Sequence, residues 1–287
     1  MTVERVRKHL LNLHSAVCRL KNSKDETIVK RAILSLDELF LLCVVGEFNS
    51  GKSSLINRIV GKDVLRVGAT PTTDRILALT SSKRVSSPSF LESEIETIGL
   101  SSNSNNMSWL SRGFIIDSPG TNAIVKGHQE ISESLIPRAD LIVFLTSADR
   151  PFTESERTFL NLIRSWRKHI IIVVNKIDLL KDDSERIEVR EFVRDAARKT
   201  LGENVSDFMV SSLTTTSDTH DEFKQLEQLV HNTMSEESAT MIKLESICGV
   251  GLKVLETHLK SCERRDEIIQ DDVNTLNLLE TQNENWQ

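Results

Sequence analysis

A glycine-rich loop at residues 46–53 has the residue types and spacing to bind a nucleotide phosphate. Its sequence, Gly-Glu-Phe-Asn-Ser-Gly-Lys-Ser, follows an apolar run and precedes a helical pattern, which is the context that a P-loop requires. The two glycines let the backbone turn so that several N–H groups point at a phosphate. Lys52 could reach the β- and γ-phosphates, and Ser53 could ligate Mg²⁺. We expect the nucleotide to contact Gly46, Glu47, Phe48, Asn49, Ser50, Gly51, Lys52, Ser53 and Ser54.

Two further loops carry residues that could respond to the γ-phosphate. Residues 69–74 contain several threonines, of which Thr73 is expected to bind Mg²⁺ and the γ-phosphate and to release them after hydrolysis. Thr72 is the alternative for this role. A purely structural interpretation is that these threonines form an ordinary turn. Asp117 ends an apolar run and begins the sequence Asp-Ser-Pro-Gly. Ligands bind where parallel strands end, so Asp117 is expected to hold Mg²⁺ through water and Gly120 to donate its N–H to the γ-phosphate. The predicted metal ligands are Ser53, Thr73 and Asp117.

The sequence Asn175-Lys-Ile-Asp178 follows another apolar run and indicates guanine as the base. The Asp178 carboxylate could accept hydrogen bonds from guanine N1–H and the exocyclic amine, and a site built for such bonds rejects a base that lacks them. Asn175 is expected to stabilise the loop and to approach the base, and the stem of Lys176 is expected to lie over the face of the base. Ser211 and Ser212 end the last predicted strand and are expected to bring a backbone N–H to the guanine oxygen. The motifs together predict a protein that binds GTP and GDP with Mg²⁺.

The sequence lacks the glutamine that Ras-like enzymes place directly after the glycine of this motif to orient the attacking water, because Thr121 occupies that position. We hypothesise that Asn49 and backbone carbonyls of residues 69–74 hold K⁺ or Na⁺ beside the phosphates when a second copy of the domain closes over the nucleotide. The alternative is that Asn49 only caps the P-loop. The predicted catalytic residues are Lys52, Thr73, Gly120 and Asn49.

Composition indicates a soluble globular protein without a strong electrostatic attraction to nucleic acid. The 287 residues carry a net charge of −6, and no nucleic-acid partner is expected. The basic cluster at residues 164–168 is expected to form a solvated helix face. The four cysteines lack a CxxC pair or histidines at zinc spacing, and we expect free thiols in a reducing, intracellular compartment. No apolar run approaches the ~20 residues of a membrane-spanning helix.

The pattern of apolar residues predicts the elements that position these motifs. Helical stripes occupy residues 2–20 and 28–36, and strand-like runs alternate with helical or polar segments from Leu41 to Val210. This alternation predicts an α/β fold, a P-loop GTPase domain with a mostly parallel sheet and helices on both faces. The helical C-terminal stripe is expected to pack on the N-terminal helices as an α-helical bundle. The predicted domains are 1–39 (bundle), 40–235 (GTPase domain) and 236–287 (bundle, expected to be incomplete).

With these motifs in order, the chain resembles a dynamin-related GTPase. The P-loop, Ala69-Thr-Pro-Thr-Thr, Asp117-Ser-Pro-Gly-Thr-Asn, Pro137-Arg-Ala-Asp-Leu and the segment 147–156 are most similar to the FZO-like group, relatives of mitofusins and bacterial dynamin-like proteins. The resemblance implies GTP hydrolysis, a homodimer through the GTPase domains in the GTP or transition state, and membrane fusion or remodelling. It also implies membrane contact through regions missing or incomplete in this chain, in a chloroplast (thylakoid) or mitochondrion.

Two alternatives and one unexplained segment remain at this stage. A GTPase similar to Era or MnmE, acting on RNA, shares the motifs, and so does a switch that binds GTP without hydrolysing it. In the segment 147–156, Asp149, Arg150 and Glu154 could bridge two GTPase domains. The alternative is a helix start capped by Thr153, with Glu156 three residues later.

Overall fold

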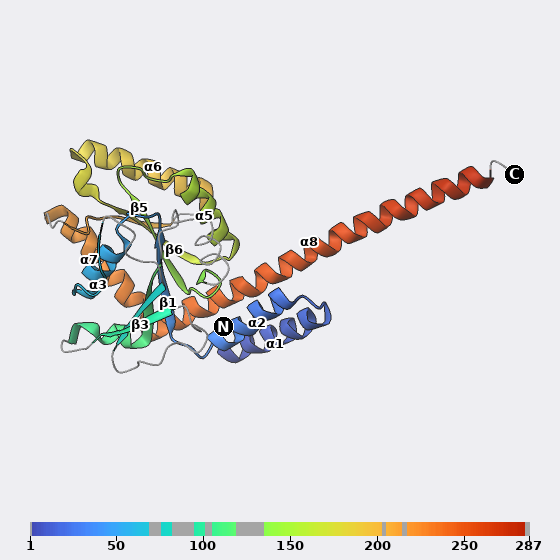
Figure 1. Cartoon of the computed structure of the whole chain (residues 1–287), viewed down its shortest axis with the longest axis horizontal. Helices are drawn as coiled ribbons and strands as arrows, with labels where there is room; N and C mark the ends of the chain where they lie inside the picture. The colour runs from blue at the N-terminus through green and yellow to red at the C-terminus, as the bar shows by residue number, and fades with distance from the viewer. Residues whose placement is uncertain are drawn as a thin grey trace.

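The computed structural model describes residues 2–68, 76–81, 95–100, 105–118, 135–202, 205–213 and 217–284. Within these residues a seven-stranded sheet carries helices on both faces, and one long helix extends away from it (Figure 1). The strands are β1 (Phe40–Gly46), β2 (Ile76–Ser81), β3 (Ile95–Leu100), β4 (Gly113–Asp117), β5 (Leu141–Ser147), β6 (His169–Asn175) and β7 (Ser206–Met209). The helices are α1 (Val3–Arg19), α2 (Ser23–Ser35), α3 (Lys52–Val60), α5 (Glu154–Ser165), α6 (Asp183–Leu201), α7 (Ser217–Thr233) and α8 (Glu236–Glu284), with short 3₁₀ turns η1 (Asn105–Arg112) and η3 (Ile177–Leu179).

The sheet is mostly parallel, as the sequence predicts. Its strand order is β3-β2-β4-β1-β5-β6-β7. β1 lies at the centre, parallel to both β4 and β5, and β6 and β7 continue the parallel set. The pair β2–β4 is antiparallel. Because β1, β4, β5 and β6 run in the same direction, the loops that follow them meet at one edge of the sheet.

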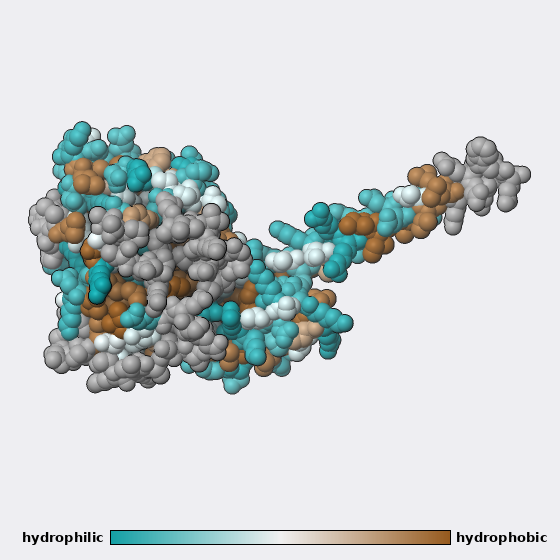
Figure 2. Space-filling model, viewed as in Figure 1, coloured by the Kyte–Doolittle hydropathy of each residue, from teal (hydrophilic) through white to brown (hydrophobic). Residues whose placement is uncertain are grey.

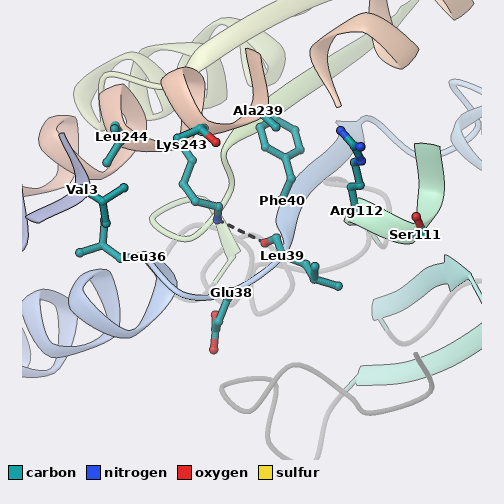
Figure 3. A pocket seen from close by; sticks show the side chains of 11 residues that line it. Val3, Leu36, Glu38, Leu39, Phe40, Ser111, Arg112, Ala239, Lys243 and Leu244 are labelled. Atoms are coloured by element: carbon teal, nitrogen blue, oxygen red, sulfur yellow. Dashed lines mark hydrogen bonds between the residues drawn. The ribbon is translucent and has the colours of Figure 1, made fainter. Parts of the chain in front are cut away.

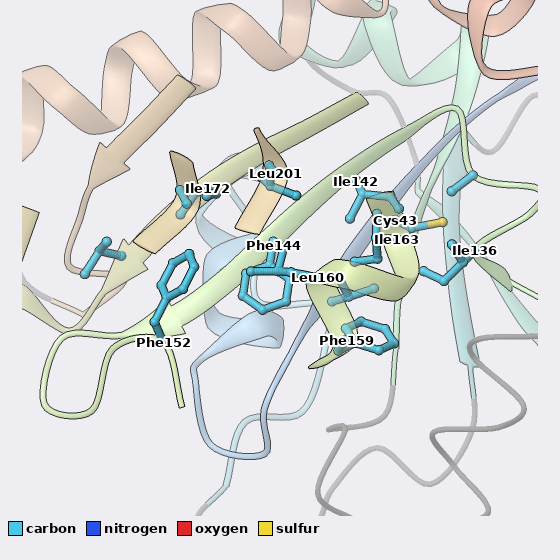
Figure 4. Close-up of a cluster of buried hydrophobic side chains, with 14 of the residues drawn as sticks. Cys43, Ile136, Ile142, Phe144, Phe152, Phe159, Leu160, Ile163, Ile172 and Leu201 are labelled. Atoms are coloured by element: carbon cyan, nitrogen blue, oxygen red, sulfur yellow. The ribbon is translucent and has the colours of Figure 1, made fainter. Parts of the chain in front are cut away.

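Alternation along β1 explains how one sheet supports two cores. Leu41, Cys43 and Val45 belong to the core that also contains residues of α5 and α6, whereas Leu42 and Val44 belong to the core that contains residues of α3 and α7. Figure 4 shows the first of these cores, with aromatic rings of α5 and β5 packed together. Both faces are buried, which accounts for the continuous apolar runs in the sequence. Each fully buried side chain of this size contributes roughly 1.5–3 kcal/mol.

Helices α1, α2 and α8 form the predicted helical bundle. Asn22 caps α2 by accepting a hydrogen bond from the Asp25 N–H, and the three helices pack through cores that include Leu10, Val17 and Val254. α8 is 49 residues long, and apolar side chains of its second half lie exposed, as Figure 2 shows for the part that extends from the bundle. No described helix combines the length and the continuous apolar character that crossing a lipid bilayer demands.

A buried polar network joins α8 to the edge of the sheet opposite the motif loops. Lys243 of α8 donates hydrogen bonds to Asp140 Oδ2 (2.7 Å) and to the Leu39 carbonyl (3.2 Å, Figure 3). The same Asp140 oxygen accepts from the Leu41 N–H at 2.8 Å. Lys168 donates to Ser246 Oγ of α8 (2.7 Å) and to a carbonyl of the 135–140 segment (2.8 Å). α8 is therefore held to the sheet by buried charges as well as by apolar contact.

The expectation that the basic cluster 164–168 forms a solvated face is wrong for Lys168, which is buried. α5 ends at Ser165, and Arg167 has a left-handed φ of 53°. That reversal turns the chain into β6 and directs Lys168 inward. Gly249 of α8 lies directly over the same turn, since a Cβ there would stand 2.9 Å from Arg167 Cβ and 3.0 Å from the Trp166 carbonyl oxygen.

Candidate functional site

The motif loops converge at the edge of the sheet where β1, β4 and β6 end. The P-loop follows β1, Asp117 ends β4, Asn175 ends β6, and Ser211 and Ser212 follow β7. Because these strands are parallel neighbours or lie one strand apart, residues far apart in the sequence form one site. The structure thus brings together the described members of the predicted set.

Glycine is required at both ends of the P-loop. A Cβ at Gly46 would lie 2.2 Å from the Leu145 carbonyl oxygen, and Gly51 has a left-handed φ of 92°. α3 begins at the next residue, Lys52, so its free N–H groups and its dipole face the loop. This strand–loop–helix arrangement is an anion-binding geometry.

The Lys52 ammonium is buried inside the loop. It donates to the carbonyls of Gly46 (3.1 Å) and Glu47 (2.9 Å). Burial lowers the pKa of Lys52 to about 8, although the charges of Asp117 and Glu47 act in the opposite direction. A buried ammonium held only by neutral carbonyls would gain strongly from an anionic partner.

Ser53 and Asp117 form a pair suited to a divalent cation. Ser53 Oγ donates to Asp117 Oδ2 at 2.7 Å, while the buried Asp117 Oδ1 has no hydrogen-bond partner among the described residues. Burial raises the pKa of Asp117, and the Ser53 hydrogen bond and the charge of Lys52 limit that rise. Unsatisfied buried carboxylate oxygens are costly. The donor set, a hydroxyl and a carboxylate, is the one that Mg²⁺ prefers, so the residues present fit this ion.

Asn175 connects the P-loop to the loop expected to contact the base. Its Nδ2 donates to the Ser50 carbonyl at 2.8 Å, and its Oδ1 accepts from the N–H (2.9 Å) and Oγ (2.8 Å) of Ser212. A Cβ at Gly51 would lie 2.3 Å from Asn175 Nδ2, so the amide packs directly against that glycine. Asn175 therefore fixes the phosphate loop relative to the 175–178 and 211–212 segments.

The residues expected to contact guanine lie next to one another. Asp178 is exposed, and its Oδ1 accepts a hydrogen bond from Ser211 Oγ. Lys176 is half-buried with a left-handed φ of 63°. Arg58 of α3 donates to the Ser211 carbonyl and stacks 4.0 Å above the ring of Phe223. No sequence motif predicts this role for Arg58, because α3 and the 211–212 segment are far apart in the sequence and meet only in the folded structure.

The segment 147–156 is tied to the P-loop. Glu47 Oε1 accepts hydrogen bonds from the hydroxyls of Thr153 and Ser155. Thr153 and Glu156 form the predicted capping box at the start of α5, which confirms the structural alternative for this part of the segment. Burial raises the pKa of Glu156 to about 7, against hydrogen bonds from Thr146 and the Thr153 N–H.

For several of the predicted site residues the structure describes no contact within the site. Thr72, Thr73 and Gly120 lie outside the described residues. Asn49 is exposed with a left-handed φ of 62°, and because the carbonyls of residues 69–74 lie outside the described residues, its monovalent cation stays a prediction. Phe48 and Ser54 are half-buried on the loop and on α3.

Comparison with known proteins identifies relatives that share this arrangement. The model of the dynamin family matches residues 42–110 and 93–178. A probable transmembrane GTPase, FZO-like and chloroplastic, from Arabidopsis thaliana is 39% identical over 196 residues, which are 66% of this chain and 21% of that protein.

Two solved structures share the fold. A chain of an oligomerised bacterial dynamin pair has a TM-score of 0.53 at 18% identity, covering 99% of this chain and 51% of that one. A dimerization-deficient mutant of Toc33 from Arabidopsis thaliana has a TM-score of 0.50 at 13% identity, covering 75% of this chain and 91% of Toc33. The chain thus spans about one fifth of the FZO-like relative and about half of the bacterial dynamin.

Proposed function

Because the chain belongs to the dynamin family of GTPases, with residues 42–178 matching that family, we propose that it binds GTP and hydrolyses it to GDP and phosphate. The strongest support is the convergence of the phosphate loop, Asp117 and the guanine-type loop, held in register by the Asn175 hydrogen bonds. The same convergence suggests the role of each side chain.

At the phosphate end, the N–H groups of the P-loop and of the first turn of α3 bind the β- and γ-phosphates. The Lys52 ammonium, which donates hydrogen bonds to carbonyls of the loop, exchanges these bonds for bonds to phosphate oxygens. A charged donor held in a buried site stabilises the negative charge that moves to the leaving oxygen during phosphoryl transfer. Glu47 helps to hold the loop in place through Thr153 and Ser155.

Ser53 and Asp117 would hold Mg²⁺, with Thr73 as the proposed further ligand. When bound, the ion neutralises charge on the β- and γ-phosphates and orients them. The unpartnered Asp117 Oδ1 supports this assignment. Gly120 is proposed to donate its N–H to the γ-phosphate, and Asn49 to help hold a monovalent cation.

At the base end, Asp178 accepts the two guanine N–H donors, and Lys176 covers one face of the ring. The exposed Asp178 carboxylate is positioned by Ser211, whose carbonyl is in turn bound by Arg58. A site whose carboxylate is satisfied by guanine discriminates strongly against adenine, because adenine offers no matching donors.

Nucleotide titration tests this proposal. Purified protein in magnesium is titrated with fluorescent GTP and ATP analogues, and GTP is expected to bind at least ~100-fold more tightly. Asp178→Ala should abolish this preference. Asp183→Ala removes an exposed carboxylate that contacts only Arg186 and serves as the matched control, with the preference retained. Equal binding of ATP and GTP to the unchanged protein would refute the assignment.

We further propose that two copies dimerise through their GTPase domains when GTP is bound, and that this dimer acts in remodelling or fusing an organelle membrane. The support is the resemblance to the FZO-like chloroplastic protein and to an oligomerised bacterial dynamin. Light scattering with GDP and aluminium fluoride should report a mass twice that of the monomer, and GDP alone should not.

Phosphate release should be faster in potassium chloride than in caesium chloride at equal ionic strength if a monovalent cation takes part.

A further inference from the structure

The helical bundle carries a cluster of metal-ligating side chains far from the nucleotide site. His14 and Cys18 lie one turn apart on α1, and Glu26 lies on α2, beyond the turn that joins these two helices. One ligand atom from each residue lies within 4.8 Å of the others, and the described residues contain no second group of this kind. We propose that His14, Cys18 and Glu26 bind a zinc-type divalent cation.

The spacing of His14 and Cys18 suits chelation. On a helix, residues four apart lie on the same face, and Cys18 Sγ is 3.7 Å from His14 Nδ1 and 3.9 Å from Nε2. In a tetrahedral zinc site with Zn–S of about 2.3 Å and Zn–N of about 2.1 Å, the sulfur and nitrogen ligands stand about 3.6 Å apart. The sulfur thus already stands at the required distance from the ring, but because it is almost equally far from both nitrogens, the imidazole must rotate to point one lone pair at the ion.

Glu26 completes the set from the second helix. One of its carboxylate oxygens lies within 4.8 Å of the ligand atoms of both His14 and Cys18. A cation bound between the sulfur and the carboxylate is attracted by both groups. The glutamate side chain is flexible, so it can move its oxygen from within 4.8 Å of the other ligand atoms to the separation of about 3.6 Å that tetrahedral geometry requires.

The neighbouring carboxylate is already engaged, which leaves Glu26 as the ligand. Asp25 Oδ2 pairs with His258 Nε2 of α8 at 2.9 Å and accepts from Asn22 Nδ2 at 2.8 Å. These contacts hold the beginning of α2 against α8 and fix the direction of the adjacent Glu26. An ion bound by Glu26 would thus join α1 to α2 beside the point where α2 contacts α8, at the end of the hairpin away from the N-terminus (Figure 1).

The donor types select the metal. Imidazole, thiolate and carboxylate together are typical ligands of zinc, whereas Mg²⁺ and Ca²⁺ require oxygen ligands. Three protein ligands leave the fourth tetrahedral position for water or for another donor. A thiolate and a carboxylate together carry two negative charges and balance the charge of the divalent ion, so the site needs no further acidic side chain.

Metal binding to the whole chain tests the proposal. Protein freed of metal by a chelator and exchanged into clean buffer is titrated with Zn²⁺ against a chromophoric chelator, and with Co²⁺ followed by absorption. We expect one Zn²⁺ per chain, and a cobalt spectrum with the thiolate-to-metal charge-transfer band and the intense visible bands of a tetrahedral ion. Cys18→Ser should remove the charge-transfer band and weaken Zn²⁺ binding by more than about tenfold.

A second histidine–cysteine pair supplies the matched control. His258 and Cys262 have the same four-residue spacing on α8 but belong to no three-ligand group among the described residues. Cys262→Ser should leave the stoichiometry and the cobalt spectrum unchanged. Zn²⁺ should also raise the melting temperature of the unchanged protein and of Cys262→Ser, and not that of Cys18→Ser.

The proposal is overturned if the unchanged protein binds no Zn²⁺, if Cys18→Ser binds it as well as Cys262→Ser, or if the cobalt spectrum lacks the thiolate band. Should Cys18→Ser fail to fold, His14→Gln replaces it with the same expected loss of binding. Retained binding of a fluorescent GTP analogue by each variant shows that its GTPase domain is intact.

Discussion

The two edges of the central sheet each bury a lysine beside an aspartate, yet they are built for different purposes. At the carboxyl edge, Lys52 and Ser53 lie with Asp117. At the amino edge, Lys243 pairs with Asp140. Asp117 and Asp140 each have one buried oxygen, Oδ1, without a hydrogen-bond partner among the described residues. Buried charge alone does not distinguish a ligand site from a structural joint.

What distinguishes the edges is their exposure to solvent, because left-handed residues occur at both, Arg167 being one at the amino edge. The carboxyl edge has Gly51, Asn49 and Lys176 in left-handed conformations, and its carboxylate Asp178 is exposed. Such loops present N–H groups to a ligand and are open to solvent. The amino edge is covered by α8, whose Lys243 and Ser246 donate hydrogen bonds to Asp140 Oδ2 and to the Ala139 carbonyl. Substitutions should therefore affect stability at one edge and nucleotide affinity at the other.

The largest expected effect belongs to Asp140→Ala at the amino edge. It leaves the buried Lys243 ammonium and the Leu41 N–H without their shared acceptor, and breaking a buried pair in this way costs about 3–5 kcal/mol. The melting temperature should fall by about 10 °C, while the preference for GTP over ATP persists. Asp37→Ala, which removes an exposed partner of Arg7, should change it by less than about 2 °C. A melting temperature that falls no further for Asp140→Ala than for Asp37→Ala, or a lost preference for GTP in Asp140→Ala, would contradict the structural role of the amino edge.

Lys52→Ala should show the opposite pattern. Loss of a charged donor to phosphate is expected to weaken GTP binding about 100-fold, or about 3 kcal/mol. Stability should change little or increase, because the desolvated ammonium with its lowered pKa is removed. Isothermal titration and a thermal melt on the same sample give both quantities. Lys260→Ala, an exposed lysine on α8, is the control for charge alone.

Asn175 is expected to affect both properties at a smaller scale. Asn175→Ala removes the hydrogen bonds to Ser50 and Ser212, and we expect a loss of about 2 kcal/mol in stability and roughly tenfold weaker binding of both GTP and GDP. Asn175→Asp keeps the acceptor for Ser212 but loses the donor to Ser50. If affinity falls equally in both variants, the bond to Ser50 is the important one, and if only alanine is harmful, the bonds to Ser212 are.

The smallest expected effect is a dependence of stability on pH that originates at Lys168. Burial lowers the pKa of Lys168 to about 7, with Asp140 opposing the shift. Above that pH the unfolded chain binds a proton at this residue that the folded chain does not, so folding becomes more favourable as pH rises, by at most about 1.4 kcal/mol per pH unit. Below it the residue is charged in both states and contributes no slope.

The measurement compares urea unfolding of the unchanged protein and of Lys168→Met between pH 7 and 8.5. The difference in unfolding free energy between them should change by about 1–2 kcal/mol across this interval. Identical pH profiles would place the titration elsewhere, with Lys52 the next candidate.

The fold class and the composition of the motif loops could be predicted because they depend on local patterns. Apolar runs and glycine spacing locate β1, β4, β6 and the P-loop to within a few residues. The antiparallel β2–β4 pair has no such signature, since strand direction depends on where the chain returns. Predicting a largely parallel sheet was correct, and the exceptions are β2 and β3, which are parallel to each other and run opposite to the other five strands.

Contacts within the site could be predicted less well from the sequence than the fold, because they join residues that are far apart in the chain. Asn175 was expected to stabilise its own loop and to approach the base, whereas it also binds Ser50, which lies 125 positions earlier. Glu47 and Thr153 are similarly distant in sequence. The cysteine pattern predicted no zinc site because it lacks a CxxC pair, whereas the four-residue spacing of His14 and Cys18 on a predicted helix places both side chains on one face. The error at Lys168 has a local cause, since the left-handed Arg167 turns the chain inward.

The close packing of Gly249 against the 166–167 turn affects the direction in which α8 extends. A methyl group there acts as a wedge, and with the helix pinned near Lys243 a displacement of about 0.5 Å would tilt its axis by about 3°. At Glu284, some 50 Å further along the axis, the same tilt amounts to about 3 Å. Glycine at position 249 therefore affects the direction in which the far end of α8 extends.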